Sequence, residues 1–340
     1  MGVGSLNTNP DPASAFGASV CIVGGAGFIG SHIAARLLSD PLIERVVIFD
    51  NFSSGRKWHL SKLESDSRLR VDVSDARDLD ALCASMSDLD SVVHLASNPD
   101  IAKAATQPTI DFDQGTLLTN NVIEAMRRTQ PKSIFYASGS GVYGDVGYVD
   151  ANEDLGPLIP VSTYGASKLA GEALIASYCY MFDLRGWAFR FGNVVGPHQT
   201  HGVGFDFVRR LIDNPKSLAI LGDGNQSKSY IHVSDVIDAL LCASKSSNPG
   251  FAAYNVATGD YVTVREIAEI AIQALGIKSE LVNLKFGGGD RGWKGDVPIV
   301  RLNTDRIRSL GWSNKMSTRD ALRSSIESMI EDTRAGLFDE

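Results

Sequence analysis

The sequence predicts an α/β fold: a doubly wound parallel sheet followed by a smaller C-terminal substrate-binding lobe. First, short apolar, β-branched runs alternate with longer stretches of helical period, the pattern of parallel strands covered by helices on both faces. Second, a glycine-rich loop connects the first apolar run to the first helical stretch. Third, the alternation loosens after residue 192, where glycine and proline become frequent. We therefore expect the sheet in the first part of the chain and a less regular lobe after it.

The elements are expected in alternating order along the chain. Strands are predicted over 18–23, 45–50, 91–95, 133–137 and 186–191, where the runs have strand length and composition. Helices are predicted where apolar residues recur at helical spacing, over 28–39, near 76–86, 107–129 and 163–181, and then at 203–213, 234–244, 263–275 and 317–332. This order divides the chain into a flexible tail (1–17), a cofactor domain (18–192) and a lobe (193–340), with 230–258 returning to the sheet.

Composition and charge exclude several classes of protein. With 340 residues, 44% hydrophobic and 21% charged, the chain has the make-up of a globular protein with a sizeable core. It has no uncharged run long enough to span a membrane. A net charge of −8 without a long basic run argues against nucleic acid or an anionic membrane as a partner.

The cysteines and histidines bear on the cellular location of the protein and on whether it binds a metal ion. The four cysteines lie far apart and form no C-x-x-C pair, so we interpret them as buried, reduced thiols. The N-terminal residues have neither a cationic start nor an apolar core of a signal peptide. These observations predict a cytoplasmic protein. No histidines and carboxylates have the spacing of metal ligands, so no metal site is expected.

The glycine-rich loop predicts a dinucleotide site in a Rossmann-type sheet. Gly24, Gly27 and Gly30 have the spacing G-x-x-G-x-x-G between the first strand and the first helix, where glycines let the backbone approach a pyrophosphate at the helix N-terminus. Such a loop alone is also found as a simple turn. Asp50, however, ends the second strand about 20 residues beyond Gly30, where a carboxylate accepts the ribose hydroxyls of adenosine. That carboxylate would repel a 2′-phosphate, so NAD is favoured over NADP, although Arg56 lies nearby.

A tyrosine and a lysine form the candidate catalytic pair. Tyr164 and Lys168 are four residues apart at the start of a predicted helix and so share one helix face. A Y-x-x-x-K spacing is common by chance, and the alternative is an exposed helix pair. Because a tyrosine normally titrates near ~10, a general base at neutral pH needs a nearby cation. Lys168, together with the positive nicotinamide ring of NAD⁺, would supply it.

Six segments in series resemble one enzyme family. They are GGAGFIGS (24–31), FDNFSSG (49–55), HLAS (94–97), YASGSGVYG (136–144), YGASK (164–168) and FRFGNVVGP (189–197). Together they resemble the extended short-chain dehydrogenase/reductase family, in particular its NAD-dependent nucleotide-sugar epimerases and dehydratases. The similarity is greatest to UDP-hexose 4-epimerases and covers roughly residues 19–312.

The resemblance implies a role for individual residues. The NAD-binding set it implies is Gly24, Gly27, Phe28, Ile29, Gly30, Asp50, Asn51, Asp72, Val73, Leu95, Ala96, Tyr164 and Lys168. For the nucleotide diphosphate sugar it implies Asn193, Lys228 in a slot that usually holds arginine, and Arg291 (or Lys294) as a further cation. His198 and His201 follow the G-P turn at 196–197 and are placed to line the sugar pocket, with plain loop residues as the alternative. The resemblance also implies a homodimer formed by the helices over 107–129 and 163–181.

One loop departs from the family's pattern. Members usually carry a catalytic Ser or Thr three residues before the valine of V-Y-G, and here that position is Gly139. Ser138 and Ser140 flank it and are the candidate hydroxyls, with a water as the alternative. Dehydratases of the family carry an acid pair just before V-Y-G, where this chain has Ser140 and Gly141, so 4,6-dehydration is disfavoured.

The expected function is a nucleotide-sugar 4-epimerase, with Tyr164 as base and a transient 4-keto sugar. One alternative is different chemistry at the same intermediate, by a UDP-glucuronate decarboxylase or epimerase, a 5-epimerase or a reductase. The other is a non-catalytic NAD-binding relative, which Gly139 favours and the retained Tyr164 and Lys168 disfavour.

Overall fold

A seven-stranded parallel sheet forms the centre of the computed structural model, which describes residues 14–247 and 250–338. Its order is β11-β6-β5-β4-β1-β2-β3, and every neighbouring pair is parallel. The strands are β1 (Ser19–Val23), β2 (Arg45–Asp50), β3 (Leu69–Val73), β4 (Ser91–His94), β5 (Ser133–Gly139), β6 (Arg185–Phe191) and β11 (Phe251–Val256). The chain order reverses between β1 and β4, the position at which such sheets bind ligands.

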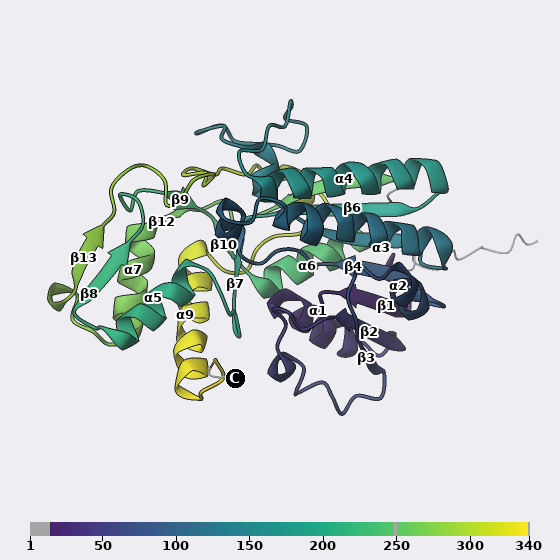
Figure 1. Ribbon diagram of the computed structural model, residues 1–340, viewed down its shortest axis with the longest axis horizontal. Helices are drawn as coiled ribbons and strands as arrows, with labels where there is room; N and C mark the ends of the chain where they lie inside the picture. Colours follow the sequence, from purple (N-terminus) through teal and green to yellow (C-terminus); the bar gives the residue numbers. More distant parts are fainter. Residues whose placement is uncertain (1–13, 248–249, 339–340) are drawn as a thin grey trace, which may run out of the picture.

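Helices cover both faces of this sheet (Figure 1). On one face α1 (Phe28–Leu38) and α6 (Val233–Ser244) pack in one apolar cluster with the strands. On the other face α2 (Leu79–Met86), α3 (Leu117–Arg128) and α4 (Thr163–Phe182) contribute to or pack beside a second cluster. The predicted doubly wound α/β fold is confirmed.

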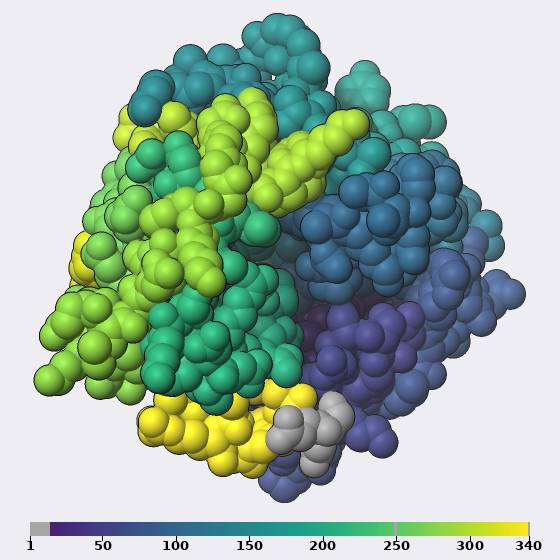
Figure 2. Space-filling model, turned by 60° about the vertical axis from the view of Figure 1, so that its left-hand side comes forward, coloured from purple at the N-terminus to yellow at the C-terminus, as the bar shows by residue number. Residues whose placement is uncertain are grey.

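A smaller lobe carries its own core. Its helices are α5 (Val203–Asp213), α7 (Val264–Ala274) and α9 (Thr318–Arg334), which pack on one another and on the strand pair of β8 (Ser217–Ile220) and β13 (Asn283–Phe286). The helix α8 (Asp305–Arg308) lies against β11, and short pairs join β7 (Asn193–Val195) to β10 (Tyr230–His232) and β9 (Ser227–Lys228) to β12 (Val262–Thr263). A space-filling view shows a hollow between the green lobe and the blue and purple sheet half (Figure 2).

The sequence reasoning missed β3, and it gave no strand at β11, although it expected the segment 230–258 that contains β11 to return to the sheet. β3 has the sequence LRVDV and lies at the sheet edge, where Arg70 and Val73 are exposed. Because an edge strand is not buried on both faces, it lacks the continuous apolar run that identified the others. β11 starts with FAAY, whose alanines carry little strand signal. It nevertheless pairs with β6 along six residues.

Two predicted boundaries are wrong. The helix expected from residue 107 begins later: a π-helical segment over Phe112–Thr116 precedes α3. The flexible tail predicted over 1–17 extends too far along the chain. Residues 1–13 lie outside the described residues, but Ala15 and Phe16 are buried, and the ring of Phe16 stacks on Phe135 with centroids 4.0 Å apart.

The expectations for cysteines, metals and membrane spans can be compared with the described residues. All four cysteines are free, but only Cys21 and Cys179 are buried, so full burial is wrong for Cys83 and Cys242. In the ranges 14–247 and 250–338, no cluster of His, Cys, Asp or Glu has the grouping of a metal site. No helix in the same ranges has the length and apolar character needed to cross a membrane.

Candidate functional site

The glycine-rich loop forms a close-packed turn between β1 and α1. Gly24 has φ +83°, and a Cβ on it would lie 2.7 Å from the backbone nitrogen of Ala96. A Cβ on Gly30 would lie 2.6 Å from the carbonyl oxygen of Gly24. Gly27 is the N-cap of α1 and makes no side-chain cap hydrogen bond. The loop thus leaves the first amides of α1 without a side-chain cap, as a bound pyrophosphate requires.

The ends of β2 and β4 border this loop. The buried carboxylate of Asp50 accepts hydrogen bonds from the amides of Ala26 at 2.9 Å and Phe52 at 2.8 Å. Burial raises its pKa, and these two bonds oppose the shift. The amides of Leu95 and Ala96 both donate to the carbonyl of Val23, at 2.9 and 3.0 Å. Asp50, Leu95 and Ala96 are therefore brought to the glycine loop as the sequence predicted.

The other proposed cofactor residues differ in their surroundings. The side-chain amide of Asn51 donates a hydrogen bond to the Asp75 carboxylate at 3.0 Å. The carboxylate of Asp72 accepts hydrogen bonds from the Arg70 guanidinium at 2.9 Å and from the Ser85 hydroxyl at 2.7 Å. The side chain of the neighbouring Val73 is exposed. Phe28 is buried in the core, so its side chain faces the sheet and Ile29 packs partly against the same cluster. The ring of Phe28 is therefore part of the core, and its backbone lies at the start of α1.

A test of the loop is the substitution Gly24→Ala. We expect it to weaken NAD binding by at least ~10-fold, because a methyl group would collide with Ala96 and strain a left-handed residue. Isothermal titration of the apoprotein with NAD measures the change. Gly276→Ala is the matched control, since Gly276 also has a positive φ of +70° but no neighbour within 4 Å of an added Cβ. Equal NAD affinity of the two variants would contradict this role of the loop.

Tyr164 and Lys168 lie at the start of α4, which the Ser162 hydroxyl caps. The Lys168 ammonium is buried, donates to the carbonyl of Ala137 at 2.7 Å and lies 5.5 Å from the centre of the Tyr164 ring. Burial lowers the pKa of Lys168 to about 8, whereas the nearby Asp111 and Glu172 carboxylates act to raise it. The structure thus brings the two predicted catalytic residues together on one face of α4.

The Tyr164 hydroxyl is protonated at neutral pH in the protein without ligands. Burial raises its pKa to about 12, and the charge of Asp111 raises it further. The Ser97 side chain acts in the opposite direction and lowers this pKa. To serve as a base, Tyr164 therefore needs additional positive charge when its ligands are bound.

The buried lysine predicts a pH-dependent gain of stability in Lys168→Met. Its pKa falls from 10.5 to about 8 on folding, so the folded state disfavours the charged form. This cost is fully present below pH ~8 and disappears as pH rises toward ~10.5, because the folded protein releases the proton first. We expect Lys168→Met to raise the free energy of unfolding by about 1–3 kcal/mol near neutral pH.

Chemical denaturation of both proteins across this pH range measures the difference, in which other titrating groups cancel. The advantage of Lys168→Met should shrink as pH rises. A variant that is less stable at neutral pH, or a difference that does not change with pH, would contradict the buried, destabilising charge.

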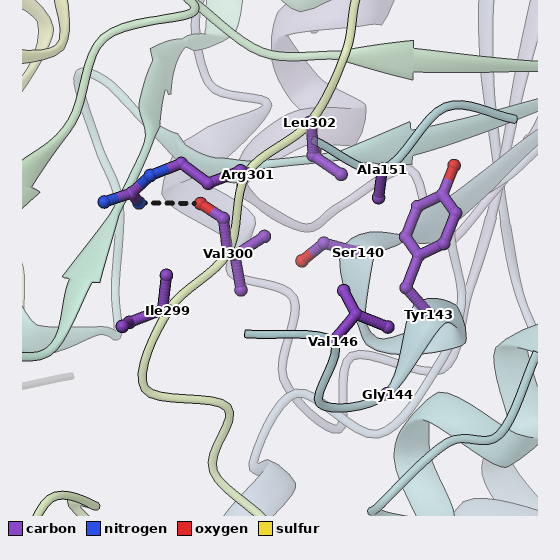
Figure 3. A pocket seen from close by; sticks show the side chains of 9 residues that line it. All are labelled: Ser140, Tyr143, Gly144, Val146, Ala151, Ile299, Val300, Arg301 and Leu302. Atoms are coloured by element: carbon purple, nitrogen blue, oxygen red, sulfur yellow. Dashed lines mark hydrogen bonds between the residues drawn. The ribbon is translucent and has the colours of Figure 1, made fainter. Parts of the chain in front are cut away.

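The two candidate serines of the V-Y-G loop have different partners. The Ser138 hydroxyl is buried and donates to a carboxylate oxygen of Glu172 at 2.5 Å. Ser140 lines a small pocket with Tyr143, Val146 and residues 299–302 of the lobe (Figure 3). A Cβ added at Gly139 would meet no atom within 4 Å. The position that usually carries the hydroxyl is therefore open space.

A buried ion pair is connected to the V-Y-G loop through Tyr143. Arg190 of β6 and Glu172 of α4 approach to 2.7 Å, with side chains 6% and 5% exposed. Arg190 also donates to the Tyr143 hydroxyl at 3.0 Å, and Tyr143 donates to the side chain of Asn255 in β11 at 2.8 Å. The network links α4, β6, β11 and the V-Y-G loop through polar groups that have partners.

The cations predicted for the substrate diphosphate are already paired. The Lys228 ammonium lies 2.6 Å from a carboxylate oxygen of Asp296. The Arg291 guanidinium contacts Asp145 and donates to the backbone carbonyl of Asp296 at 2.5 Å. A diphosphate at these residues would share or replace carboxylate partners. The structure therefore clusters Lys228, Arg291 and Asp296 at one place in the lobe.

The remaining two substrate candidates lie on exposed segments. Asn193 opens β7, and its side-chain amide donates to the carbonyl of Ser229 at 3.3 Å. His201 is exposed just before α5. His198, which the sequence reasoning placed with His201 at the sugar, instead directs its Nδ1 to the Asp332 carboxylate of α9 at 3.1 Å.

Sequence reasoning missed a set of polar residues beside Tyr164. The buried carboxylate of Asp111 accepts from the Asn98 side chain at 2.8 Å and from the Thr163 hydroxyl at 2.6 Å. Ser97 precedes Asn98 in the chain, and its side chain acts to lower the pKa of Tyr164. The one sequence feature that could have indicated these residues is Ser97, the polar residue that ends the HLAS segment.

Comparison with known proteins gives a consistent result. The family model "NAD dependent epimerase/dehydratase family" matches residues 20–257. A UDP-glucose 4-epimerase from Mycolicibacterium smegmatis is 30% identical over 315 residues, covering 90% of this chain and 96% of that protein. A crystal structure of a UDP-galactose 4-epimerase has 34% identity and a TM-score of 0.81, covering 92% of this chain and 99% of its own.

The same fold also carries other chemistry. The structure of a dTDP-glucose 4,6-dehydratase from Streptomyces venezuelae with NAD and TYD bound has 25% identity and a TM-score of 0.85. It covers 94% of this chain and 98% of that one. Overall shape thus does not separate the two activities, and residues within the site have to do so.

Proposed function

The chain belongs to the NAD dependent epimerase/dehydratase family, and from that premise we propose that it is an NAD-dependent nucleotide-sugar 4-epimerase acting on UDP-hexoses. The observation that carries the proposal is the buried Lys168 ammonium 5.5 Å from the ring centre of Tyr164. UDP-hexoses are favoured because the relative at 30% identity and the solved structure at 34% identity described above bear the names UDP-glucose and UDP-galactose 4-epimerase.

The residues of the glycine loop fit NAD. A Cβ at Gly24 or Gly30 would collide with backbone atoms of Ala96 or Gly24, so this tight turn requires glycine. Gly27 leaves the start of α1 without a side-chain cap. Asp50 stands at the end of β2 to accept a ribose diol, which favours NAD over NADP. NAD, when bound, supplies the acceptor and donor of the hydride at C4 of the sugar. Residues 18–192 would thus bind NAD, and the lobe over 193–340 the sugar nucleotide.

In the proposed mechanism, Tyr164 moves the proton of the sugar's C4 hydroxyl. It takes that proton as C4 becomes a ketone and returns it when the hydroxyl forms again on the opposite face. Lys168 supplies positive charge that favours the phenolate and holds its own position through the carbonyl of Ala137. Lys228 and Arg291 hold the diphosphate, so the nucleotide stays fixed while the sugar turns.

Dehydration is disfavoured by the loop before V-Y-G. Expelling the C6 hydroxyl needs a general acid, and the positions where dehydratases carry acids hold Ser140 and Gly141. The second candidate class comprises a UDP-glucuronate decarboxylase or epimerase, a 5-epimerase and a reductase. A non-catalytic NAD-binding relative is favoured only by Gly139, whose β-position is empty space.

Incubation with separate nucleotide sugars tests the proposal. UDP-glucose, UDP-N-acetylglucosamine, UDP-glucuronate and TDP-glucose would each be followed by proton NMR, with NADH absorbance recorded in parallel. We expect the coupling of the ring proton at C4 to change for a UDP-hexose, without net formation or loss of NADH. Stoichiometric NADH consumption, loss of the carboxylate, or no conversion of any sugar would refute a 4-epimerase.

We further propose a homodimer in the cytoplasm. The outward face of α4 carries small exposed residues, Ala166, Ala173 and Ser177, which allow close packing with the helices of a second copy. Light scattering should give twice the chain mass, and a monomer mass would contradict the dimer. Free thiols at all four cysteines are consistent with a reducing compartment. Cell fractionation tests this location, and enrichment in a membrane or secreted fraction would contradict it.

A further inference from the structure

We propose that His59 is a positioning residue that joins the glycine loop to the lobe and thereby couples the binding of NAD to the binding of the sugar nucleotide. The inference rests on the proposed function, in which the loop holds NAD and the lobe holds the sugar nucleotide. His59 ends the 3₁₀ turn Lys57–His59, which follows β2, and its side chain is buried. Its ring lies between two backbone carbonyls, one from each part of the molecule.

One ring nitrogen contacts the glycine loop. Nδ1 of His59 lies 2.8 Å from the carbonyl oxygen of Ala26, the residue before the N-cap Gly27 of α1. The amide of Arg56 donates to the same carbonyl at 3.0 Å, and the amide of Ala26 donates to Asp50 at 2.9 Å. Ala26 is thus held at both its carbonyl and its amide. The turn that we propose to receive the pyrophosphate therefore depends in part on His59 for its shape.

The other ring nitrogen contacts the lobe. Nε2 of His59 lies 3.0 Å from the carbonyl oxygen of His198, in the segment between β7 and α5. Nδ1 of His198 lies 3.1 Å from both carboxylate oxygens of Asp332 in α9. His32 of α1 contacts the carbonyl of the neighbouring Pro197 at 2.9 Å. The segment before α5 is therefore attached to the sheet half by two histidines and to the last helix of the lobe through Asp332.

Both contacts of His59 are hydrogen bonds only when its ring is charged. A carbonyl oxygen accepts and cannot donate, and a neutral imidazole has a proton on only one nitrogen. The imidazolium has a proton on both nitrogens and can donate to Ala26 and His198 together. Burial lowers the pKa of His59, whereas the two carbonyls act to raise it. We therefore expect both hydrogen bonds in mildly acidic solution and the loss of one of them as the pH rises.

Charged and titratable groups on several elements act on this ring. They are Arg56, His32, His198, His201 and Asp50. The carboxylate of Asp50 favours the imidazolium, and the cationic groups oppose it. Because some of these groups titrate in the same pH range, the pH dependence of the wild type has to be compared with that of variants changed only at residue 59.

Two substitutions separate the two contacts. Asparagine carries its side-chain nitrogen near the position of Nδ1 in histidine, and glutamine carries it near that of Nε2. His59→Asn therefore keeps a donor for Ala26 and loses the one for His198, and His59→Gln does the reverse. Isothermal titration of the apoprotein with NAD, with and without saturating UDP as the probe for the lobe, measures both effects. The ratio of the two NAD dissociation constants is the coupling factor.

The two variants should differ in NAD affinity and agree in coupling. We expect a coupling factor of at least ~5 in the wild type and a fall toward 1 in both variants, since each breaks one contact. Without UDP, His59→Gln should bind NAD about 10-fold more weakly than the wild type, and His59→Asn should stay within ~3-fold of it. The coupling factor of the wild type should be larger at pH ~5.5 than at pH ~8. The neutral amides of the variants should show no such change.

Lys57→Ala is the matched control, because Lys57 lies in the same turn with an exposed side chain and should retain the affinity and coupling of the wild type. Circular dichroism melting verifies that each variant is folded. Equal NAD affinity in His59→Asn and His59→Gln, or coupling of wild-type size in both, would overturn the inference. So would a wild type that binds NAD and UDP independently, and the proposed function would stand in all three cases. A wild type that bound neither ligand would refute the proposed function and this inference with it.

Discussion

Tyr164→Phe is expected to lower turnover by roughly 10²- to 10⁴-fold, the typical contribution of a positioned general base, while leaving NAD binding intact. The change removes one oxygen atom and keeps the ring that packs beside Lys168. The glycine loop and Asp50, which we propose to hold NAD, are on other elements. Turnover of the best sugar and titration with NAD, measured on the same preparation, check both parts.

Tyr180→Phe is the matched control for this variant. It removes a phenolic hydroxyl from the same helix, but the side chain is 90% exposed, and turnover should stay at the wild-type level. If Tyr164→Phe turned over sugar at a comparable rate, the assignment of Tyr164 as base would be wrong.

The second large effect concerns stability. Glu172→Ala is expected to lower the free energy of unfolding by about 3–5 kcal/mol, because it leaves the charge of Arg190 buried without its partner. The two side chains lie 2.7 Å apart and are nearly inaccessible to solvent. Glu172 is also the acceptor of the Ser138 hydroxyl. Urea unfolding followed by circular dichroism measures the loss.

Two further variants make this prediction specific. Replacing both partners by methionine should recover much of the stability, since no unpaired charge remains in the core. Lys315→Ala breaks an ion pair with Asp238 in which the lysine is 72% exposed, and it should have little effect. If Glu172→Ala were as stable as Lys315→Ala, the buried pair would not have the importance assigned to it.

The sheet could be predicted from sequence wherever burial on both faces left a clear pattern. RVVIFD at 45–50 is continuous and apolar, and it forms β2 with the predicted bounds. LRVDV at 69–73 could not be recognised in this way, because its edge position leaves polar side chains facing solvent. The helix predicted from residue 107 starts too early, because residues 107–109 form a turn. Apolar spacing also does not distinguish the π-helical residues 112–116 from the α-helix that follows them.

The candidate site was predictable where short local motifs define it. The loop from Gly24 to Gly30 and the pair of Tyr164 and Lys168 depend on spacing within one segment, and spacing is visible in a sequence. The hydrogen bonds that Asn98 and Thr163 donate to Asp111 join segments far apart in the chain, which only the fold brings together. The carboxylate partners of Lys228 and Arg291 were missed for the same reason.

The most direct test of the central claim is to convert UDP-glucose in deuterium oxide and locate deuterium by NMR. In the proposed reaction, Tyr164 exchanges only the hydroxyl proton, and the hydrogen on C4 leaves and returns within the closed site. We therefore expect a mixture of the two C4 epimers, both with hydrogen and no deuterium at C4 and C5. Deuterium at C5, deuterium at C4, or recovery of UDP-glucose alone would contradict a 4-epimerase that works through a transient 4-keto sugar.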